Sequence, residues 1–409
     1  MDDSKQIACH ECDLLIKLTH LAEGCKALCP RCGYTLTINH RNARDRVIAF
    51  SLTALVFLGL SFAFPFLTFS AQGQDRIATL MQSVTVMITE DFTSLAVIIF
   101  ITIIIIPALY LLSATYVYMS LNTSRLFPGT RKVMKLIGHL QHWSMADIFL
   151  IGILISFIKI MSLADVSLGL SFWSYVLFII SMTAAVLHID KHQIWQWIKE
   201  KENIPAAAPV PQHGVHQACH VCTELTDESK KICDICGTHL YLRIKNSVQK
   251  TWALLITAVF LYIPANMLPI MRTNLFGEET TNTILGGVLV LWEHGSYPIA
   301  MVIFIASVMV PVGKIIALGW LCYSVQTQNQ SSYQQKTQLY RVTELVGRWS
   351  MVDVFVVAVL VALIKLGNIM SIYPGWGAIA FAGMVIVTVM AALSFDPRLI
   401  WDPIKKEKN

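Results

Sequence analysis

The chain has 409 residues, of which 55% are hydrophobic and 14% are charged, with a formal net charge of +5 at pH 7. This composition lies far from the average of soluble proteins and indicates an integral membrane protein. The cations form no basic run interleaved with aromatic residues, which argues against a nucleic-acid partner.

Residues 1–46 are polar and carry two Cys-x-x-Cys pairs, an arrangement that returns in residues 214–247. Each pair presents two thiolates on one tight turn, and two such turns can close a tetrahedron around Zn²⁺. Domains this small need a bound metal ion or disulfides in order to fold, so we expect one structural zinc ribbon in each. The eight expected ligands are Cys9, Cys12, Cys29, Cys32, Cys219, Cys222, Cys233 and Cys236. Two disulfides per domain and a rubredoxin-like iron site are the alternatives.

Eight apolar runs accompany the two ribbons, and each is near the ~20 residues that a membrane-spanning helix needs. The first follows 46 mostly polar residues, so it is expected to span the membrane rather than to act as a cleaved signal peptide. The runs are 47–69, 93–119, 146–164, 171–188, 252–271, 298–324, 352–370 and 376–394. The predicted fold is therefore an all-α polytopic membrane protein, in which a zinc ribbon and a four-helix module occur twice in tandem.

The predicted domain boundaries follow from these runs. The ribbons occupy 1–46 and 214–247, the membrane modules 47–190 and 248–395, and a tail 396–409. Residues 191–213 connect the halves. Between the halves, 188–202 is expected to form an amphipathic helix at the membrane interface, anchored by Trp195 and Trp197, and 204–211 a semi-rigid Pro-rich linker.

The two halves align residue by residue. A heptapeptide at 141–147 (QHWSMAD) returns at 347–353 (GRWSMVD), and each copy is followed by a lysine twelve residues after its aspartate. The matched pairs are Pro65 with Pro269, Pro107 with Pro311, Asp147 with Asp353, and Lys159 with Lys365. Each heptapeptide is expected at the mouth of a membrane helix. A charge at bilayer depth costs at least ~2.5–3.5 kcal/mol, so it is normally kept for a partner or a function.

The lysines and arginines predict the topology. The segments outside the predicted spans alternate between the two sides of the membrane. Those on one side carry 26 lysines and arginines and those on the other side carry two, while three more lie inside spans. The positive-inside rule then places both termini and both ribbons in the cytoplasm, where thiols stay reduced. The loops at 70–92 and 272–297 are expected on the opposite side, as a docking surface.

Polar residues distinguish the second half from the first. Ser307 and Lys314 share one face of the sixth predicted span, around Pro311, whereas the first half has Ile103 and Tyr110 at the matching positions. We expect this face to form a charge-paired site in a membrane cavity; an ion pair that only locks the bundle is the alternative.

The partners expected for this face come from the neighbouring spans. Lys314 should meet Asp353, with Ser350 one turn before it, and Thr388 could close the cluster. Lys159 and Lys365 are secondary candidates that can instead extend to the interface, and Asp147 is expected to be mainly structural.

Motifs for hydrolysis are absent from the sequence. Val308 stands where a phosphate-binding loop ending at Lys314 would need its first glycine, and no Gly-x-Ser-x-Gly or His-Glu-x-x-His occurs. We therefore expect no catalytic residue, no nucleotide site and no enzymatic activity.

Several stretches resemble the paraquat-inducible protein A family over nearly the whole chain. Besides the two ribbons they are 263–270 (IPANMLPI), 283–287 (TILGG), 347–353 (GRWSMVD) and 395–402 (FDPRLIWD). The resemblance implies a protein of the bacterial inner membrane whose partner is a periplasmic tunnel of MCE domains. It also implies transport of phospholipids or other lipophilic molecules, a role in envelope integrity, and a functional polar network at Ser307, Lys314, Ser350, Asp353 and Thr388.

Three other interpretations are compatible with the sequence. A stand-alone proton-coupled transporter of small solutes would work without a partner. A redox protein would hold iron in its cysteine clusters, and a scaffold would only anchor the tunnel.

Overall fold

The computed structural model describes residues 5–18, 21–71, 74–89, 92–161, 165–204, 217–226, 230–275, 278–293, 295, 297–328, 332–347, 349–363 and 370–402. Apart from the ribbons, the elements follow the same order in both halves: a long helix, a β-hairpin, a short helix, a helix with a π-helical turn, two consecutive helices, a single strand and a final helix. A four-cysteine ribbon precedes each set. The predicted Pro-rich linker at 204–211 lies almost wholly outside the described residues.

The elements of the first half begin with four ribbon strands and end with the connecting helix α8. They are β1 (Lys5–Ala8), β2 (Leu15–Leu18), β3 (Lys26–Leu28), β4 (Thr35–Ile38), α1 (Ala43–Leu60), β5 (Leu67–Ala71), β6 (Gln74–Ala78), α2 (Gln82–Thr89), α3 (Thr93–Phe100), η1 (Ile101–Ile105), α4 (Ile106–Asn122), α5 (Thr130–Trp143), α6 (Ala146–Met161), β7 (Asp165–Leu168), α7 (Leu170–His188) and α8 (Lys191–Lys201).

The elements of the second half begin with two short ribbon strands and end with a 3₁₀ turn. They are β8 (Gln217–Ala218), β9 (Leu225–Thr226), α9 (Ser247–Met267), β10 (Met271–Leu275), β11 (Glu278–Asn282), α10 (Ile284–Glu293), α11 (Tyr297–Phe304), η2 (Ile305–Met309), α12 (Val310–Gln326), α13 (Tyr333–Gly347), η3 (Trp349–Met351), α14 (Val352–Leu363), β12 (Met370–Pro374), α15 (Trp376–Ser394) and η4 (Pro397–Ile400).

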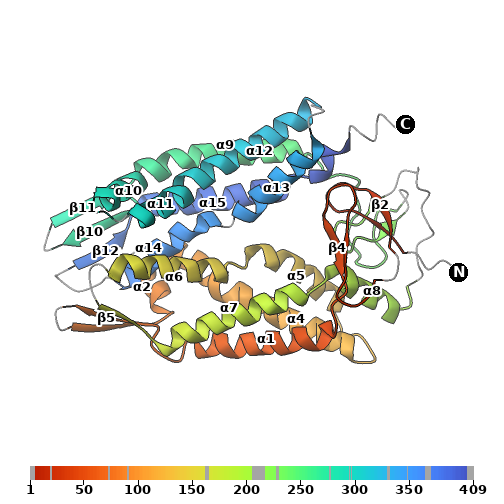
Figure 1. Cartoon of the computed structure of the whole chain (residues 1–409), viewed down its shortest axis with the longest axis horizontal. Helices are drawn as coiled ribbons and strands as arrows, with labels where there is room; N and C mark the ends of the chain where they lie inside the picture. Colours follow the sequence, from red (N-terminus) through yellow and green to blue (C-terminus); the bar gives the residue numbers. More distant parts are fainter. Residues whose placement is uncertain are drawn as a thin grey trace.

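Small β-sheets lie at one end of the molecule and the cysteine ribbons at the other, here called the sheet end and the ribbon end (Figure 1). Each sheet is antiparallel and has three strands, in the order β6-β5-β7 and β11-β10-β12. The hairpin that follows the first helix of each half thus pairs with the strand that precedes the last helix. The all-α prediction is wrong at this end, because the two segments expected as loops fold into hairpins and the short helices α2 and α10.

In the part of the chain that the structure describes, six helical stretches are long and apolar enough to cross a membrane. They are Thr93–Asn122, Thr130–Phe157, Leu170–His188, Ser247–Met267, Ala300–Gln326 and Trp376–Ser394. Two of the eight predicted spans are not among them. Helix α1 has 18 residues and carries Arg44, Asp45 and Arg46 in its first turn, and α14 has twelve described residues.

The repeated heptapeptide lies where two consecutive helices meet. Helices α5 and α6 form one stretch of 28 residues, Thr130–Phe157, that is interrupted where Ser144 adopts an extended conformation. In the second half, α13, η3 and α14 follow one another in the same way. Each heptapeptide ends in the first turn of an apolar helix, as predicted, because α6 begins at Ala146 and α14 at Val352. The sequence did not predict that α5 and α13 lead directly into these helices.

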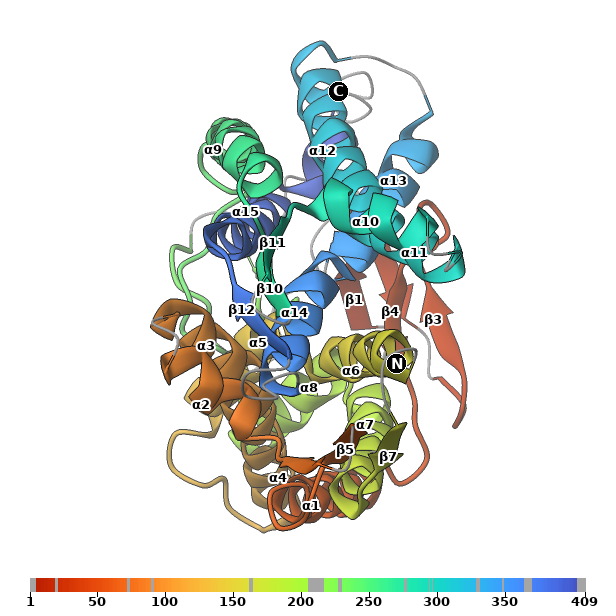
Figure 2. The ribbon, with the colours of Figure 1, turned by 90° about the vertical axis from the view of Figure 1, so that its left-hand side faces the viewer.

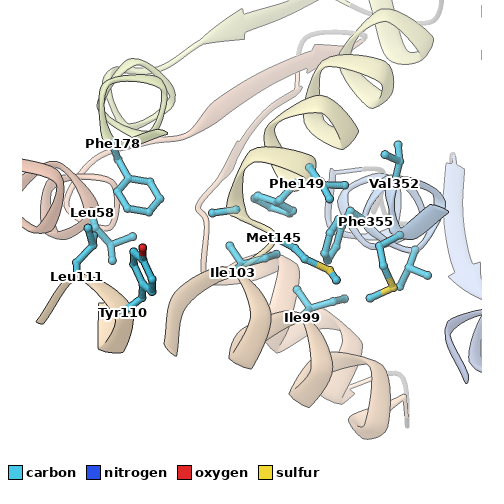
Figure 3. Close-up of a cluster of buried hydrophobic side chains, with 14 of the residues drawn as sticks. Leu58, Ile99, Ile103, Tyr110, Leu111, Met145, Phe149, Phe178, Val352 and Phe355 are labelled. Atoms are coloured by element: carbon cyan, nitrogen blue, oxygen red, sulfur yellow. The ribbon is translucent and has the colours of Figure 1, made fainter. Parts of the chain in front are cut away.

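Helices α6 and α14 join the two halves and lie side by side at the centre of the molecule (Figure 2). The rings of Phe149 and Phe355 meet edge to face, with centroids 5.7 Å apart (Figure 3). Gly152 permits this approach, because a Cβ there would come within 3.0 Å of the Cβ of Phe355. The apolar core is continuous from one half to the other through this contact.

Helix α8 packs between the two ribbons. Asp190 caps its first turn and also accepts hydrogen bonds from the Thr37 hydroxyl (2.8 Å) and the Ile38 amide (2.7 Å) of the first ribbon. Lys199 pairs with Glu224 of the second ribbon. Trp195, predicted as an interface anchor, is instead 2% exposed, because this face of α8 packs against protein.

Candidate functional site

Two clusters of four cysteines are the candidate metal centres. Within each cluster the four sulfur atoms lie within 4.8 Å of one another. Cys9 and Cys32 Sγ are 3.5 Å apart, and Cys219 and Cys236 Sγ are 3.4 Å apart. These separations exceed the ~2.05 Å of a disulfide, and they suit thiolates on the edges of a tetrahedron with ~2.3 Å metal–sulfur bonds. The eight cysteines predicted as ligands therefore form two clusters at metal-binding distances.

The backbone shapes each Cys-x-x-Cys turn in the same way. The residue after the second cysteine donates its amide to the carbonyl of the first, at 2.8–2.9 Å in all four turns. That residue has a positive φ each time, namely Asp13 (55°), Gly33 (72°), Thr223 (61°) and Gly237 (64°). Glycine adopts this conformation without strain, whereas aspartate and threonine are held in it by the surrounding fold.

Hydrogen bonds between the sulfurs separate the pKa values within each cluster. Bonds from Cys12 and Cys9 hold the pKa of Cys32 well below its usual range, and bonds from Cys219, Cys222 and Cys233 do the same for the pKa of Cys236. The same contacts raise the pKa of Cys12 and of Cys222. Each cluster thus has at least one sulfur that favours the thiolate form a metal requires. A zinc ion bound there would complete the domain, because binding and folding are one event in such ribbons.

Each ribbon packs on the opposite half of the molecule. Arg341 of α13, in the second half, donates to Glu11 of the first ribbon and to the Cys32 carbonyl at 2.9 Å. The second ribbon contacts α8 of the first half through Glu224 and through Thr223, whose hydroxyl is 3.0 Å from His192 Nδ1. Sequence reasoning missed this arrangement, since the contacts of the first ribbon join residues more than 300 positions apart.

Lys314 is a buried cation of the second half. It lies in the first turn and a half of α12, is 4% exposed, and donates a hydrogen bond of 3.2 Å to the Thr388 hydroxyl of α15. Thr388 in turn donates to the Val385 carbonyl at 2.8 Å. The structure therefore brings together two of the predicted network residues from helices 74 positions apart.

Gly347, at the end of α13, lies directly against the Lys314 side chain. A Cβ at this position would be 2.8 Å from Lys314 Nζ and 3.0 Å from Cε. The Ser350 hydroxyl, 1% exposed, donates to the Gly347 carbonyl at 3.0 Å. Ser350 is thus placed in the wall of the site through Gly347, a contact that the repeated heptapeptide does not reveal.

Ser307 lies in a π-helical turn that precedes Pro311. The turn, η2, has its counterpart in η1 of the first half, at the same distance before Pro107. Proline cannot donate to the carbonyl four residues back, and its ring forces that turn to widen. The Ser307 hydroxyl is fully buried and donates to the Ile303 carbonyl at 2.6 Å, and η2 contacts η3, which holds Ser350.

The remaining predicted residues are less completely described. Asp353 lies in the first turn of α14, and Lys159 in the last turn of α6, but their side chains are outside the described set. Lys365 lies outside the described residues altogether. Asp147 is exposed on the surface of α6. The pairing of Lys314 with Asp353 therefore stays a prediction.

The matching position in the first half is apolar. Tyr110 and Ile103 replace Lys314 and Ser307 and are 1% and 2% exposed within the hydrophobic cluster of Figure 3. The Tyr110 hydroxyl is buried and has no hydrogen-bond partner among the described residues. A buried cation at this level of the bundle is thus described only in the second half.

Comparison with known proteins identifies one matching family profile and several similar proteins. The sequence profile described as "Paraquat-inducible protein A" matches residues 45–199 and 248–405. "Intermembrane transport protein PqiA" of Escherichia coli (strain K12) is 40% identical over 98% of this chain and 96% of its own length. "Lipophilic envelope-spanning tunnel protein A" of the same strain is 30% identical over 96% and 90%. A "Probable intermembrane transport protein" of Haemophilus influenzae is 28% identical over 99% and 97%.

No solved structure gave a significant match. The relatives are named as transport proteins rather than as enzymes, and the apolar helices make this chain a multi-pass membrane protein. The profile covers most of both halves, and the first relative covers nearly every residue. The chain belongs to the paraquat-inducible protein A family.

Proposed function

We propose that this protein is the inner-membrane subunit of an intermembrane lipid transport system. It loads phospholipids or other lipophilic molecules into a periplasmic tunnel of MCE domains, or unloads them from it, and so contributes to envelope integrity under stress. The observation that carries the proposal is Lys314, a cation buried beside Thr388 in the second half of a mainly apolar bundle. A charge in that position is costly, so a function is expected for it.

The transport site comprises Ser307, Lys314, Ser350, Asp353 and Thr388. Four of these side chains are at most 4% exposed and come from η2, α12, η3 and α15, while Asp353 is at the start of α14. An ammonium has three donors, and Thr388 takes one of them. The other two donors can bind a lipid headgroup or pass a proton to a carboxylate. A proton gradient or mass action would then supply the energy for transport.

The proposed topology has eight spans in two parallel four-helix modules, made by tandem duplication. Both termini and both ribbons lie in the cytoplasm, and each ribbon holds one structural Zn²⁺. The distribution of lysine and arginine and the matching order of elements support this arrangement. The sheet end then faces the periplasm, where the tunnel protein docks.

The names of two relatives, an intermembrane transport protein and an envelope-spanning tunnel protein, support a role between two membranes. Purification of the tagged protein from native membranes, with identification of co-purifying proteins and lipids, tests this role. We expect an MCE-domain protein and bound phospholipid. Recovery of the chain without either would contradict the proposal.

Substitution of the buried residues separates transport from scaffolding. Lys314→Met and Asp353→Asn should abolish resistance to detergents and redox cyclers while the complex still assembles. A scaffold that only anchors the tunnel would keep that resistance with both substitutions. Proton-dependent uptake of small solutes into liposomes without a partner would favour the stand-alone transporter instead.

A further inference from the structure

A cavity of about 590 Å³ leads from the ribbon end to Lys314. At its outer side it is lined by Gly33 and Thr35 of the first ribbon, which are exposed, and at its inner side by Lys314 and Val389, which are 4% and 7% exposed. The wall between them carries charged groups, among them Glu344 of α13. The buried ammonium therefore lies at the end of an opening lined by both charged and apolar residues rather than in a sealed core.

The wall of the cavity comes from both halves and from one ribbon. Glu11 and Tyr34 belong to the first ribbon, His142 to α5 and Lys191 to α8, while α13 contributes Glu344. Of the lining residues in the described part of the chain, none belongs to the second ribbon. The two ribbons have similar cysteine clusters, but of the two only the first lines the described wall of the cavity that reaches Lys314.

Helix α13 connects the first ribbon to the buried lysine. Arg341 holds the ribbon through Glu11, whose side chain is 7% exposed, and through the Cys32 carbonyl. Six residues further along the same helix, about 9 Å away at 1.5 Å per residue, Gly347 lies against Lys314. Hydrogen bonds between charged groups are among the stronger ones in proteins, so this pair fixes where the ribbon rests.

We propose that this cavity is a cytosolic vestibule through which water and small polar solutes reach Lys314, and that the first zinc ribbon, held by Glu11 and Arg341, is its outer wall. The inference rests on the proposed function for the sidedness of the ribbon end and for the role of Lys314. In this proposal the first ribbon controls access to the transport site of the opposite half. The second ribbon does not share this role.

Thiol accessibility tests the vestibule without any lipid or partner. Val389→Cys places a thiol at the inner end of the cavity, and the adjacent Met390→Cys, at a position 44% exposed on the apolar outside of α15, is the matched control. Each full-length variant is treated with a membrane-impermeant cationic methanethiosulfonate reagent, in inverted vesicles for the cytosolic face and in spheroplasts for the outer face. Peptide mass spectrometry locates the modification and separates it from the native cysteines.

We expect the thiol at position 389 to react from the cytosolic face only, and the thiol at 390 from neither face. Cys25, which is exposed in the first ribbon, reports independently which face the ribbons occupy. If the thiol at position 389 reacts from the same face as Cys25, the result supports the vestibule, whichever face that is. If that face is the outer one, the proposed topology is wrong. Reaction at 389 no faster than at 390, or from the face opposite to Cys25, would overturn the vestibule.

The role of the ribbon is tested in the Val389→Cys background. Arg341→Leu should raise the rate of modification about tenfold, which corresponds to about 1.4 kcal/mol of lost docking free energy. Lys199→Leu breaks the ion pair of the second ribbon with α8 and should leave the rate unchanged. Glu11→Arg combined with Arg341→Glu should restore the original rate. Equal effects of the Arg341 and Lys199 substitutions would show that the first ribbon is not the wall.

Discussion

At Gly347 the absence of a side chain decides where Lys314 can lie. Gly347→Ala would place a methyl group 2.8 Å from Nζ, so the ammonium must leave its contact with Thr388. Since the position has no positive φ, the backbone itself accepts alanine. We expect the variant to accumulate at a normal level and to lose envelope resistance, measured by immunoblot and by growth on detergent.

Gly313→Ala is the matched control for this prediction. Gly313 adjoins Lys314 in α12, yet an added Cβ there meets no atom within 4 Å. The control should keep full resistance. If Gly347→Ala retained resistance as well, the position of the Lys314 ammonium would not matter for function.

Asp396 and Arg398 form a buried ion pair just beyond α15. Burial alone would raise the pKa of the Asp396 carboxyl, but the hydrogen bonds and charge of Arg398 outweigh it and leave that pKa lowered. Removing one member of a buried pair leaves the other charge uncompensated, so Asp396→Asn should reduce the free energy of unfolding by about 3 kcal/mol at pH 7. Thermal unfolding in detergent measures the loss.

The pH dependence of this effect has a definite sign. A carboxyl whose pKa is lowered by folding stabilises the protein above its unfolded pKa of about 3.9, and that stability is lost as the pH falls through the folded value. The difference between wild type and Asp396→Asn should therefore stay constant from pH 7 to about pH 5 and shrink only below about pH 4. Glu23→Gln, at an exposed pair with Arg41, should show no such difference. A difference that already narrowed at neutral pH would contradict the assignment.

Under the proposed zinc assignment, the ribbons are the elements whose folding depends most directly on a bound ion. Cys233→Ser removes one of four sulfurs, so the second cluster should lose its metal while the first keeps its own. Metal content measured by mass spectrometry should fall from two zinc ions per chain to one, and protein abundance should fall with it.

Cys25→Ser is the control for this substitution, because Cys25 is exposed and lies outside both clusters. It should keep two zinc ions per chain. Unchanged metal content in Cys233→Ser, or iron in place of zinc, would refute the assignment of the ribbons as structural zinc sites.

The sequence predicted the elements that depend on local pattern. Four thiols spaced as two pairs determine a ribbon, and a run of about 20 apolar residues determines a spanning helix, so the cysteine clusters and six of the eight spans follow directly. The break at Ser144 and the π-helical turn before Pro311 carry weaker signals. A widened turn needs both the proline and neighbours that pack around it, and the sequence does not show those neighbours.

Contacts between distant segments account for the rest of what sequence reasoning missed. The hairpins at the sheet end pair with strands about 100 residues later. Glu11 meets Arg341 across 330 positions, and Gly347 meets Lys314 from another helix. Ser307 and Thr388 could be predicted because they are polar residues in apolar spans. A glycine contact, and an ion pair between charged residues of polar segments, have no such contrast with their sequence neighbours.

At the scale of the whole molecule, the two halves are interlocked rather than merely adjacent. Their apolar cores meet at α6 and α14, where Phe149 packs on Phe355. At the ribbon end each ribbon binds the opposite half, and Arg243, which follows the second ribbon, also reaches Asp13 of the first at 3.0 Å. The two halves, which share one order of elements, therefore form one structural unit, in which neither half has all its contacts alone.

This interlocking predicts how a divided chain behaves. Residues 1–204 and 217–409, expressed together as separate polypeptides with a tag on the second, should co-purify, because apolar and ionic contacts both join them. The second fragment expressed alone should be degraded, since it lacks the first ribbon that covers α13. Combining Arg341→Leu with Gly152→Leu, which forces a large side chain against Phe355, should abolish co-purification, whereas Gly313→Ala should not affect it. If the second fragment were stable alone and did not retain the first, the halves would be independent units, and a ribbon from one half could not control access to the site of the other.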